Sequence, residues 1–217
     1  MTMRLRLRLA VAAASLALAG APGRAVPAVP AATDAGGVLE HQHTVVPGLK
    51  VSMVNYAVPD LQLVRDDGRK VSLPSELDDG RPVVLNFIYT TCPGICPVMS
   101  QVFKQFQSQL GQEREKVHMV SISIDPEQDT PPRLREYASK FSAGPQWRHY
   151  TGTVSASIAA QKAFGAYRGD KMSHDPLTLM RFAPGKPWMR IEGLASAQDL
   201  VAQYVSLAAQ CQAAPQK

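Results

Sequence analysis

The chain has few cysteines, few charges and no nucleic-acid-binding pattern, and each scarcity excludes a class of protein. Three cysteines among 217 residues are too few for a disulfide scaffold, and a chain of this length buries a core without one. Only 19% of the residues are charged, and no run of Lys and Arg with interleaved aromatic residues occurs. The sequence therefore makes no case for nucleic acid as a partner, and its composition is that of one globular domain with additional end segments.

Long apolar runs are also missing. Residues 9–18 are apolar but too short to cross a bilayer comfortably, which takes about 20 residues. Arginines precede this segment, small residues with Ala-x-Ala spacing follow it, and no cysteine comes next as a lipoprotein would require. We expect residues 1–25 to be a signal peptide, with a retained membrane anchor as the alternative. The mature protein is then periplasmic or otherwise extracytoplasmic.

The rest of the chain divides into an extension and one folded domain. Residues 26–50, rich in Ala, Pro and Gly at their start, predict a linker and N-terminal extension, and residues 51–210 predict the domain. Two alternating segments, 61–64 and 70–73, flank an Asp-Gly pair that ends at Gly68. This pattern predicts an N-terminal β-hairpin.

Strands and helices alternate through the predicted domain. Apolar runs predict buried strands, and apolar residues at helical spacing predict the helices between them. The expected strands are 81–89, 117–124, 175–182 and 188–191, and the expected helices are 98–110, 130–141, 155–166 and 196–210. This order predicts an α/β fold with a mixed central sheet flanked by helices.

Cys92 and Cys96 lie between a predicted buried strand and a predicted helix, where α/β sheets often place ligands. Their spacing of four puts both sulfurs on one helical face if the helix begins near the first of them. A helix N-terminus lowers a thiol pKa, which favours disulfide exchange or shared binding of a soft metal. A static disulfide or two inert core thiols are the alternatives. Cys211 is assigned no role.

The cysteine segment, FIYTTCPGICP at 87–97, resembles the signature loop of the Sco (SenC) family of copper chaperones. These are thioredoxin-like proteins that help to assemble the copper centre of cytochrome c oxidase. Residues 120–131 are similar to that family's strand and acidic turn, and 134–141 to its next helix. The resemblance extends over residues 59–193. It implies a thioredoxin-like fold, copper as Cu(I) or Cu(II), and a copper-receiving oxidase subunit or another copper chaperone as partner.

The resemblance also implies that Cys92, Cys96 and His174 bind the metal, because His174 precedes a strand where the family has its metal-binding histidine. Two thiolates and an imidazole suit copper, because thiolates favour Cu(I) and both oxidation states tolerate imidazole. The chain departs from the family at Gly94, where an acidic residue is usual, and at Ser173, where Asp is common. We expect the missing carboxylates to weaken copper affinity.

Other residues near these positions have structural explanations at least as good as chemical ones. Met99 and Met172 lie near the expected ligands and offer soft sulfur, although methionine usually fills cores. The other histidines and two aspartates are expected to be turn, helix-start, packing or solvated groups: His41, His43, His118, His149, Asp125 and Asp129.

Two functions use the same sulfurs. The first is an exported copper carrier, which needs His174. The second is a thiol–disulfide oxidoreductase in which Cys92 and Cys96 form the redox pair and reduce the cysteines of copper-binding partners. A cis proline at Pro176, ahead of the next strand, would favour this second function. A peroxidase is excluded because the loop lacks the expected peroxidatic cysteine pattern.

Overall fold

A computed structural model describes residues 48–213. The expected signal peptide, residues 1–25, most of the expected linker, 26–50, and the histidines His41 and His43 lie outside this range. Within residues 48–213 no helix is both long and apolar enough to cross a membrane.

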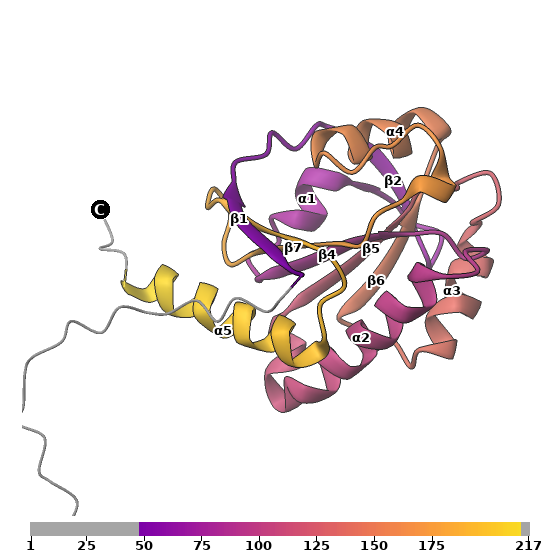
Figure 1. Cartoon of the computed structure of the whole chain (residues 1–217). Helices are drawn as coiled ribbons and strands as arrows, with labels where there is room; N and C mark the ends of the chain where they lie inside the picture. Colours follow the sequence, from indigo (N-terminus) through magenta and orange to yellow (C-terminus); the bar gives the residue numbers. More distant parts are fainter. Residues whose placement is uncertain (1–47, 214–217) are drawn as a thin grey trace, which may run out of the picture. The chain divides into compact units, whose positions relative to one another are not determined.

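An eight-stranded mixed sheet forms the centre of the fold, in the order β1-β8-β7-β4-β5-β6-β2-β3 (Figure 1). The three strands β4, β5 and β6 run parallel, and every other pairing is antiparallel. The strands are β1 (Lys50–Val54), β2 (Gln62–Arg65), β3 (Lys70–Ser72), β4 (Val83–Ile88), β5 (His118–Ser123), β6 (Trp147–Thr151), β7 (Leu177–Arg181) and β8 (Trp188–Glu192). The expected mixed sheet is confirmed.

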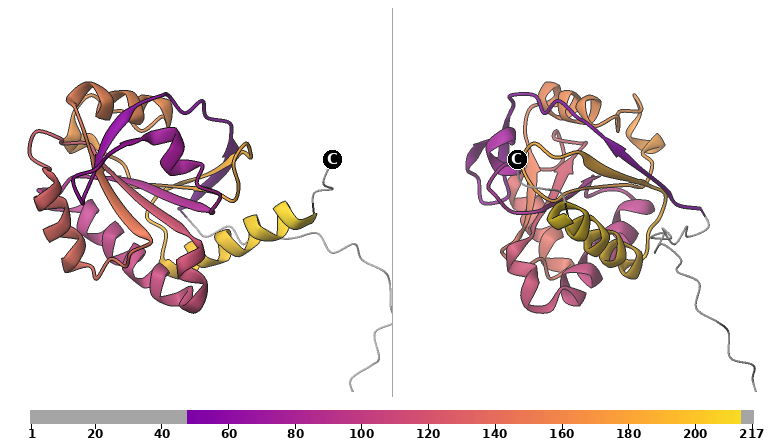
Figure 2. Two further views of the ribbon diagram at one scale, coloured as in Figure 1. Left: turned by 180° about the vertical axis from the view of Figure 1, so that it is seen from behind. Right: turned by 90° about the vertical axis from the view of Figure 1, so that its left-hand side faces the viewer.

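Helices cover both faces of the sheet (Figures 1 and 2). Helices α1 and α4 share one apolar cluster with the sheet, whereas α2 and α5 share a second cluster on the opposite face. The helices are α1 (Leu73–Leu77), α2 (Ile95–Gln109), α3 (Pro131–Lys140), α4 (Val154–Ala163) and α5 (Ala197–Ala213), with short 3-10 turns η1 (Gly111–Lys116) and η2 (Lys171–Ser173).

Strand β4 is buried along its whole length and supplies both cores. Because side chains alternate across a strand, Leu85 and Phe87 enter the α1/α4 cluster. Val84 enters the α2/α5 cluster, and Ile88 packs with the cysteines at the end of the strand. The continuous apolar run in the sequence therefore reflects a strand with no solvent-facing side.

Some elements follow the sequence pattern and others do not. The predicted hairpin is present as β2–β3, and Gly68 adopts the positive φ of 88° that favours glycine in its turn. Strands β1 and β6 and helix α1 were not predicted. Strand β6 contains Arg148 and His149, which break its apolar pattern, and its pairing with β5 decides its conformation.

Candidate metal and redox site

Cys92 and Cys96 lie where the central strand β4 passes into helix α2. The helix begins at Ile95, so Cys96 occupies its first turn, whereas Cys92 precedes the N-terminal cap residue Gly94. Only Cys96 therefore lies within the helix, whereas the sequence suggested that both sulfurs share one helical face. The backbone N–H of Cys96 donates to the Cys92 sulfur over 3.4 Å. The Cys92 sulfur therefore satisfies an N–H group at the helix terminus that would otherwise lack a partner. Both cysteines are free thiols.

The two sulfurs have different surroundings. Cys92 is 8% exposed, and Cys96 is 0% exposed in an apolar cluster with Ile88, Tyr89 and Tyr137. Burial acts to raise the pKa of Cys92, but hydrogen bonds from the backbone of Cys96 and Gly94 and from the Tyr89 hydroxyl outweigh it, so this pKa is lowered. Burial, together with the neighbouring Cys92 sulfur, raises the pKa of Cys96. Cys92 is therefore the more acidic thiol of the pair.

This difference predicts selective alkylation. In the folded, reduced protein, iodoacetamide will modify Cys92 first, and its rate will level off at a lower pH than that of an ordinary thiol because its pKa is lowered. Peptide mapping by mass spectrometry across a pH series measures both effects. The same protein in denaturant, where the helix terminus is lost, is the control. Equal rates for Cys92 and Cys96 in the folded protein would contradict the assignment.

A buried carboxylate fixes the start of the cysteine loop. Asp129, 0% exposed, accepts hydrogen bonds from the backbone N–H and the hydroxyl of Thr90, the latter over 2.6 Å. The Ser123 hydroxyl, at the end of β5, also donates to it over 2.6 Å. Asp129 therefore joins the acidic turn after β5 to the loop after β4. This role is more specific than the helix-start charge that the sequence suggests.

His174 lies beside the strand that carries the cysteine loop but apart from the two sulfurs. It precedes β7, which pairs with β4 as expected. Its Nε2 bonds to the carbonyl oxygen of Phe87 over 2.9 Å and is therefore the protonated nitrogen. Burial lowers the His174 pKa, so the ring is neutral, as a metal ligand must be. Within the described residues, no group of three or more His, Cys, Asp or Glu side chains is close enough to hold a metal ion.

The segment before His174 is tied to the site through Lys171 and Tyr89, which sequence reasoning did not select. Lys171 of η2 pairs with the buried carboxylate of Asp125 over 2.6 Å, and its ammonium group lies 5.7 Å from the centre of the Tyr89 ring. The Tyr89 hydroxyl donates to the Met172 sulfur over 3.4 Å. No local pattern predicts these contacts, because they join positions more than 40 residues apart.

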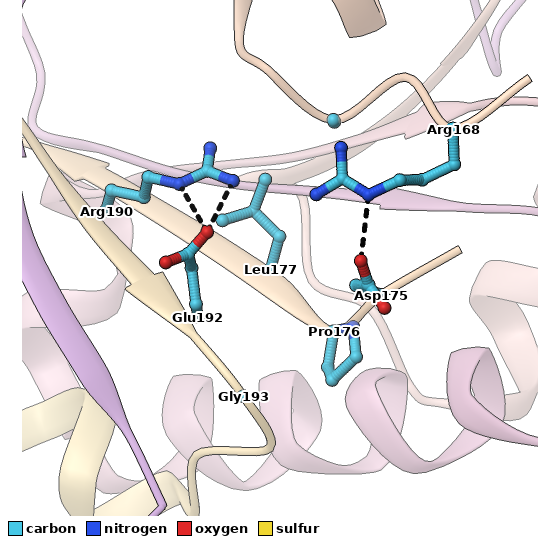
Figure 3. A pocket seen from close by; sticks show the side chains of 8 residues that line it. Arg168, Asp175, Pro176, Leu177, Arg190, Glu192 and Gly193 are labelled. Atoms are coloured by element: carbon cyan, nitrogen blue, oxygen red, sulfur yellow. Dashed lines mark hydrogen bonds and ion pairs between the residues drawn. The ribbon is translucent and has the colours of Figure 1, made fainter. Parts of the chain in front are cut away.

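A pocket of about 230 Å³ lies next to the segment after His174 (Figure 3). Arg168 pairs with Asp175 over 2.8 Å, and Arg190 pairs with Glu192 over 2.9 Å. Since each guanidinium already has a carboxylate partner, we assign the pocket no anionic ligand. Pro176 also lines it. No peptide bond in residues 48–213 is cis, so the cis proline expected at Pro176 is wrong.

The other described histidines have packing roles, as expected. His118 begins β5, at the opposite end of that strand from the acidic turn, and its ring nitrogens bond to the Glu76 carbonyl over 2.9 Å and the Tyr150 hydroxyl over 3.1 Å. His149 is fully buried and stacks on Trp147 with ring centres 5.2 Å apart. Neither contacts the cysteine loop.

The fold and the site together define the class: a thioredoxin-like protein with a Cys-x3-Cys loop between a central strand and the helix that follows it. The sequence model of the SCO1/SenC family matches residues 53–205. The chain belongs to the SCO1/SenC family.

Among curated relatives, the chain is 34% identical over 116 residues to the SCO1 protein homolog of Bacillus subtilis, which covers 52% of this chain and 59% of that protein. It is 35% identical over 100 residues to Protein SenC of Rhodobacter capsulatus, covering 46% of this chain and 44% of that protein. The chain therefore spans about half the length of the curated relatives it matches.

Solved structures agree in fold. BsSco, described as having a disulfide switch and as a member of the Sco family of cytochrome c oxidase assembly proteins, is 27% identical, with a TM-score of 0.61 and coverage of 73% of this chain and 96% of that one. Copper-bound ScoI of Bradyrhizobium japonicum is 24% identical, with a TM-score of 0.59 and coverage of 69% and 98%. Copper-bound yeast Sco1 is 20% identical, with a TM-score of 0.62 and coverage of 74% and 96%. The last two identities support the fold alone.

Proposed function

We propose that this protein binds copper at Cys92, Cys96 and His174 and carries it to an oxidase subunit. The observation that carries the proposal is the pair of free thiols at the start of α2, one of them with a lowered pKa. Thiolate sulfur is the ligand type that Cu(I) prefers. Relatives solved with copper bound, ScoI of B. japonicum and yeast Sco1, share the fold and support this choice of metal.

The two thiols enter the metal site in a definite order. Cys92, whose pKa is lowered and which is the less buried of the two residues, meets the incoming copper ion first. Cys96 has a raised pKa, so its proton leaves as the metal binds. The neutral ring of His174 supplies nitrogen once it leaves the Phe87 carbonyl. Copper is the cargo, and no bond of a substrate is broken.

The test of the ligand set is His174→Ala. We expect reduced protein to bind one Cu(II) ion and the variant to bind it about tenfold or more weakly, since the loss of even outer metal-site partners costs this much. Ser173→Ala, an exposed neighbour on the same segment, is the matched control and will bind normally. Anaerobic titration with absorption spectroscopy in the thiolate-to-copper region, together with a thiol count, measures the effect. Unchanged affinity in His174→Ala would remove this residue from the site.

A second function, thiol–disulfide exchange, is favoured by the contrast between the two thiols. The Cys92 thiolate would attack a partner disulfide, forming a mixed disulfide and releasing one partner thiolate. Cys96, losing its proton, would then attack the Cys92 sulfur and release the second thiolate. The partner gains two electrons and this chain becomes a disulfide. BsSco, described as having a disulfide switch, supports testing this reaction.

Copper binding and reduction potential separate the two functions. If the reduced protein binds no measurable copper and its reduction potential falls in the range of thiol–disulfide oxidoreductases, thiol–disulfide exchange remains as the function. Partners are a copper-receiving oxidase subunit or another copper chaperone in the first case, and a disulfide-bearing copper protein in the second. We place the protein outside the cytoplasm, released or anchored by its N-terminal segment, because the predicted export signal at residues 1–25 supports this location.

A further inference from the structure

Met172 places a third sulfur beside the cysteine loop. Its side chain is 64% exposed, more than any other large apolar side chain in the described residues. By contrast Met99, the other methionine near the expected ligands, is 4% exposed and fills the core beneath α2. The sequence gives no reason to distinguish Met172 from Met99, but their exposure does, and only the Met172 side chain is accessible.

The Met172 sulfur lies against the tyrosine that packs with both cysteines. The Tyr89 hydroxyl donates to the Met172 sulfur over 3.4 Å. Tyr89 shares a buried cluster with Cys92 and Cys96, and its backbone carbonyl accepts from the Cys92 N–H over 3.2 Å. A thioether sulfur has two lone pairs, so the Tyr89 hydroxyl occupies one of them and leaves the other to a soft ion.

Several contacts hold the backbone of Met172 near the site. The Asp170 carboxylate accepts from the Met172 N–H over 3.0 Å, and the Lys171 ammonium pairs with Asp125 over 2.6 Å. The thioether is therefore carried on an anchored turn, and only its own three rotatable bonds remain to be set.

The histidine, in contrast, is engaged elsewhere. His174 Nε2 bonds to the Phe87 carbonyl, a contact that copper binding by this ring would have to break or bypass. Three sulfurs are therefore available to a soft ion before any rearrangement of the histidine. Thiolates and thioethers together select Cu(I).

We propose that Met172 is a ligand for Cu(I), joining Cys92 and Cys96 in a three-sulfur site that takes up the ion while His174 stays on the Phe87 carbonyl. The proposal rests on the proposed copper-binding function. It adds a ligand specific to Cu(I), because a thioether contributes little to the binding of the harder Cu(II) ion. His174 is a ligand when the ion is supplied as Cu(II), and uptake of Cu(I) involves no change of oxidation state.

The test compares Met172→Leu with Met53→Leu, a methionine 48% exposed on the edge strand β1. We expect Met172→Leu to weaken Cu(I) binding about tenfold or more in anaerobic competition with a chromophoric chelator, with Cu(II) binding within about twofold of the unchanged protein. Met53→Leu will leave both affinities unchanged. Since leucine matches methionine closely in volume and the site is exposed, both variants will fold.

A second measurement observes the bond directly. In protein grown with selenomethionine, X-ray absorption at the selenium edge will show a copper neighbour when Cu(I) is bound, and Met172→Leu will remove it. A Cu(I) site with two sulfurs and one nitrogen, no selenium–copper contact and normal affinity in Met172→Leu overturns the role of Met172 and leaves the proposed function standing. Absence of Cu(I) binding by the unchanged protein overturns the copper function, and the Met172 site with it.

Discussion

Replacing Cys96 with serine will abolish tight Cu(I) binding while leaving the domain folded. Cys96 is 0% exposed, and its sulfur lies within reach of a hydrogen bond from the Tyr89 backbone, so a serine hydroxyl finds a partner in the same place. The neutral hydroxyl is a poor ligand for a soft ion, and a single thiolate remains. We expect affinity to fall about a hundredfold or more, the upper end of effects known for metal-site partners.

Anaerobic Cu(I) competition titration measures this loss, and far-UV circular dichroism reports the fold. Cys211→Ser is the matched control, because Cys211 lies near the end of α5 and has no role in the site. Its affinity will be that of the unchanged protein. Wild-type affinity in Cys96→Ser would show that copper is bound without the buried thiol and would refute the dithiol site.

Replacing Asp129 with alanine will be the most destabilising single change near the site. The carboxylate is fully buried and accepts from the Thr90 N–H, the Thr90 hydroxyl and the Ser123 hydroxyl. Alanine leaves these donors without their acceptor, and the Ser123 hydroxyl among them belongs to a fully buried residue. Breaking a buried charged interaction of this kind costs about 3 to 5 kcal/mol of unfolding free energy.

Urea unfolding monitored by tryptophan fluorescence gives the free energy of unfolding. Glu127→Ala, an exposed carboxylate in the same turn, is the control and will change stability by less than about 0.5 kcal/mol. Asp129→Asn keeps one acceptor oxygen and will be affected less than Asp129→Ala. A loss in Asp129→Ala no larger than in Glu127→Ala would mean that the Thr90 contacts contribute nothing to the loop.

The departures from the family pattern change the charge of the site more than its shape. Gly94 has φ of −127°, so its backbone does not require glycine, and a Cβ atom added there would meet no atom within 4 Å. An acidic residue at this position would therefore fit. Its absence removes negative charge beside Cys92. Ser173 is exposed, so the same conclusion holds for the missing Asp.

Much of the fold was predictable because its signals are local. The buried strand β4 is a largely apolar run, β5 carries the apolar residues Met119, Val120 and Ile122, and helices α2 and α5 have apolar residues at helical spacing. The local pattern therefore predicts their burial. Strand β6 was missed because Arg148 and His149 interrupt its pattern, and β1 because it is a short edge strand with three of its five residues exposed. Such strands depend on their partners for their conformation.

The sequence by itself determined the Cys92–Cys96 pair, its place between a strand and a helix, and the family to which the chain belongs. Only the tertiary structure decided how the two thiols differ, since the pKa of each depends on burial and on the direction of the helix N–H groups. It alone brought Asp129 to Thr90 and Met172 to Tyr89, contacts between residues 39 and 83 positions apart. Hydrogen bonds over such separations arise from the packing of strands and loops, and no local pattern encodes them.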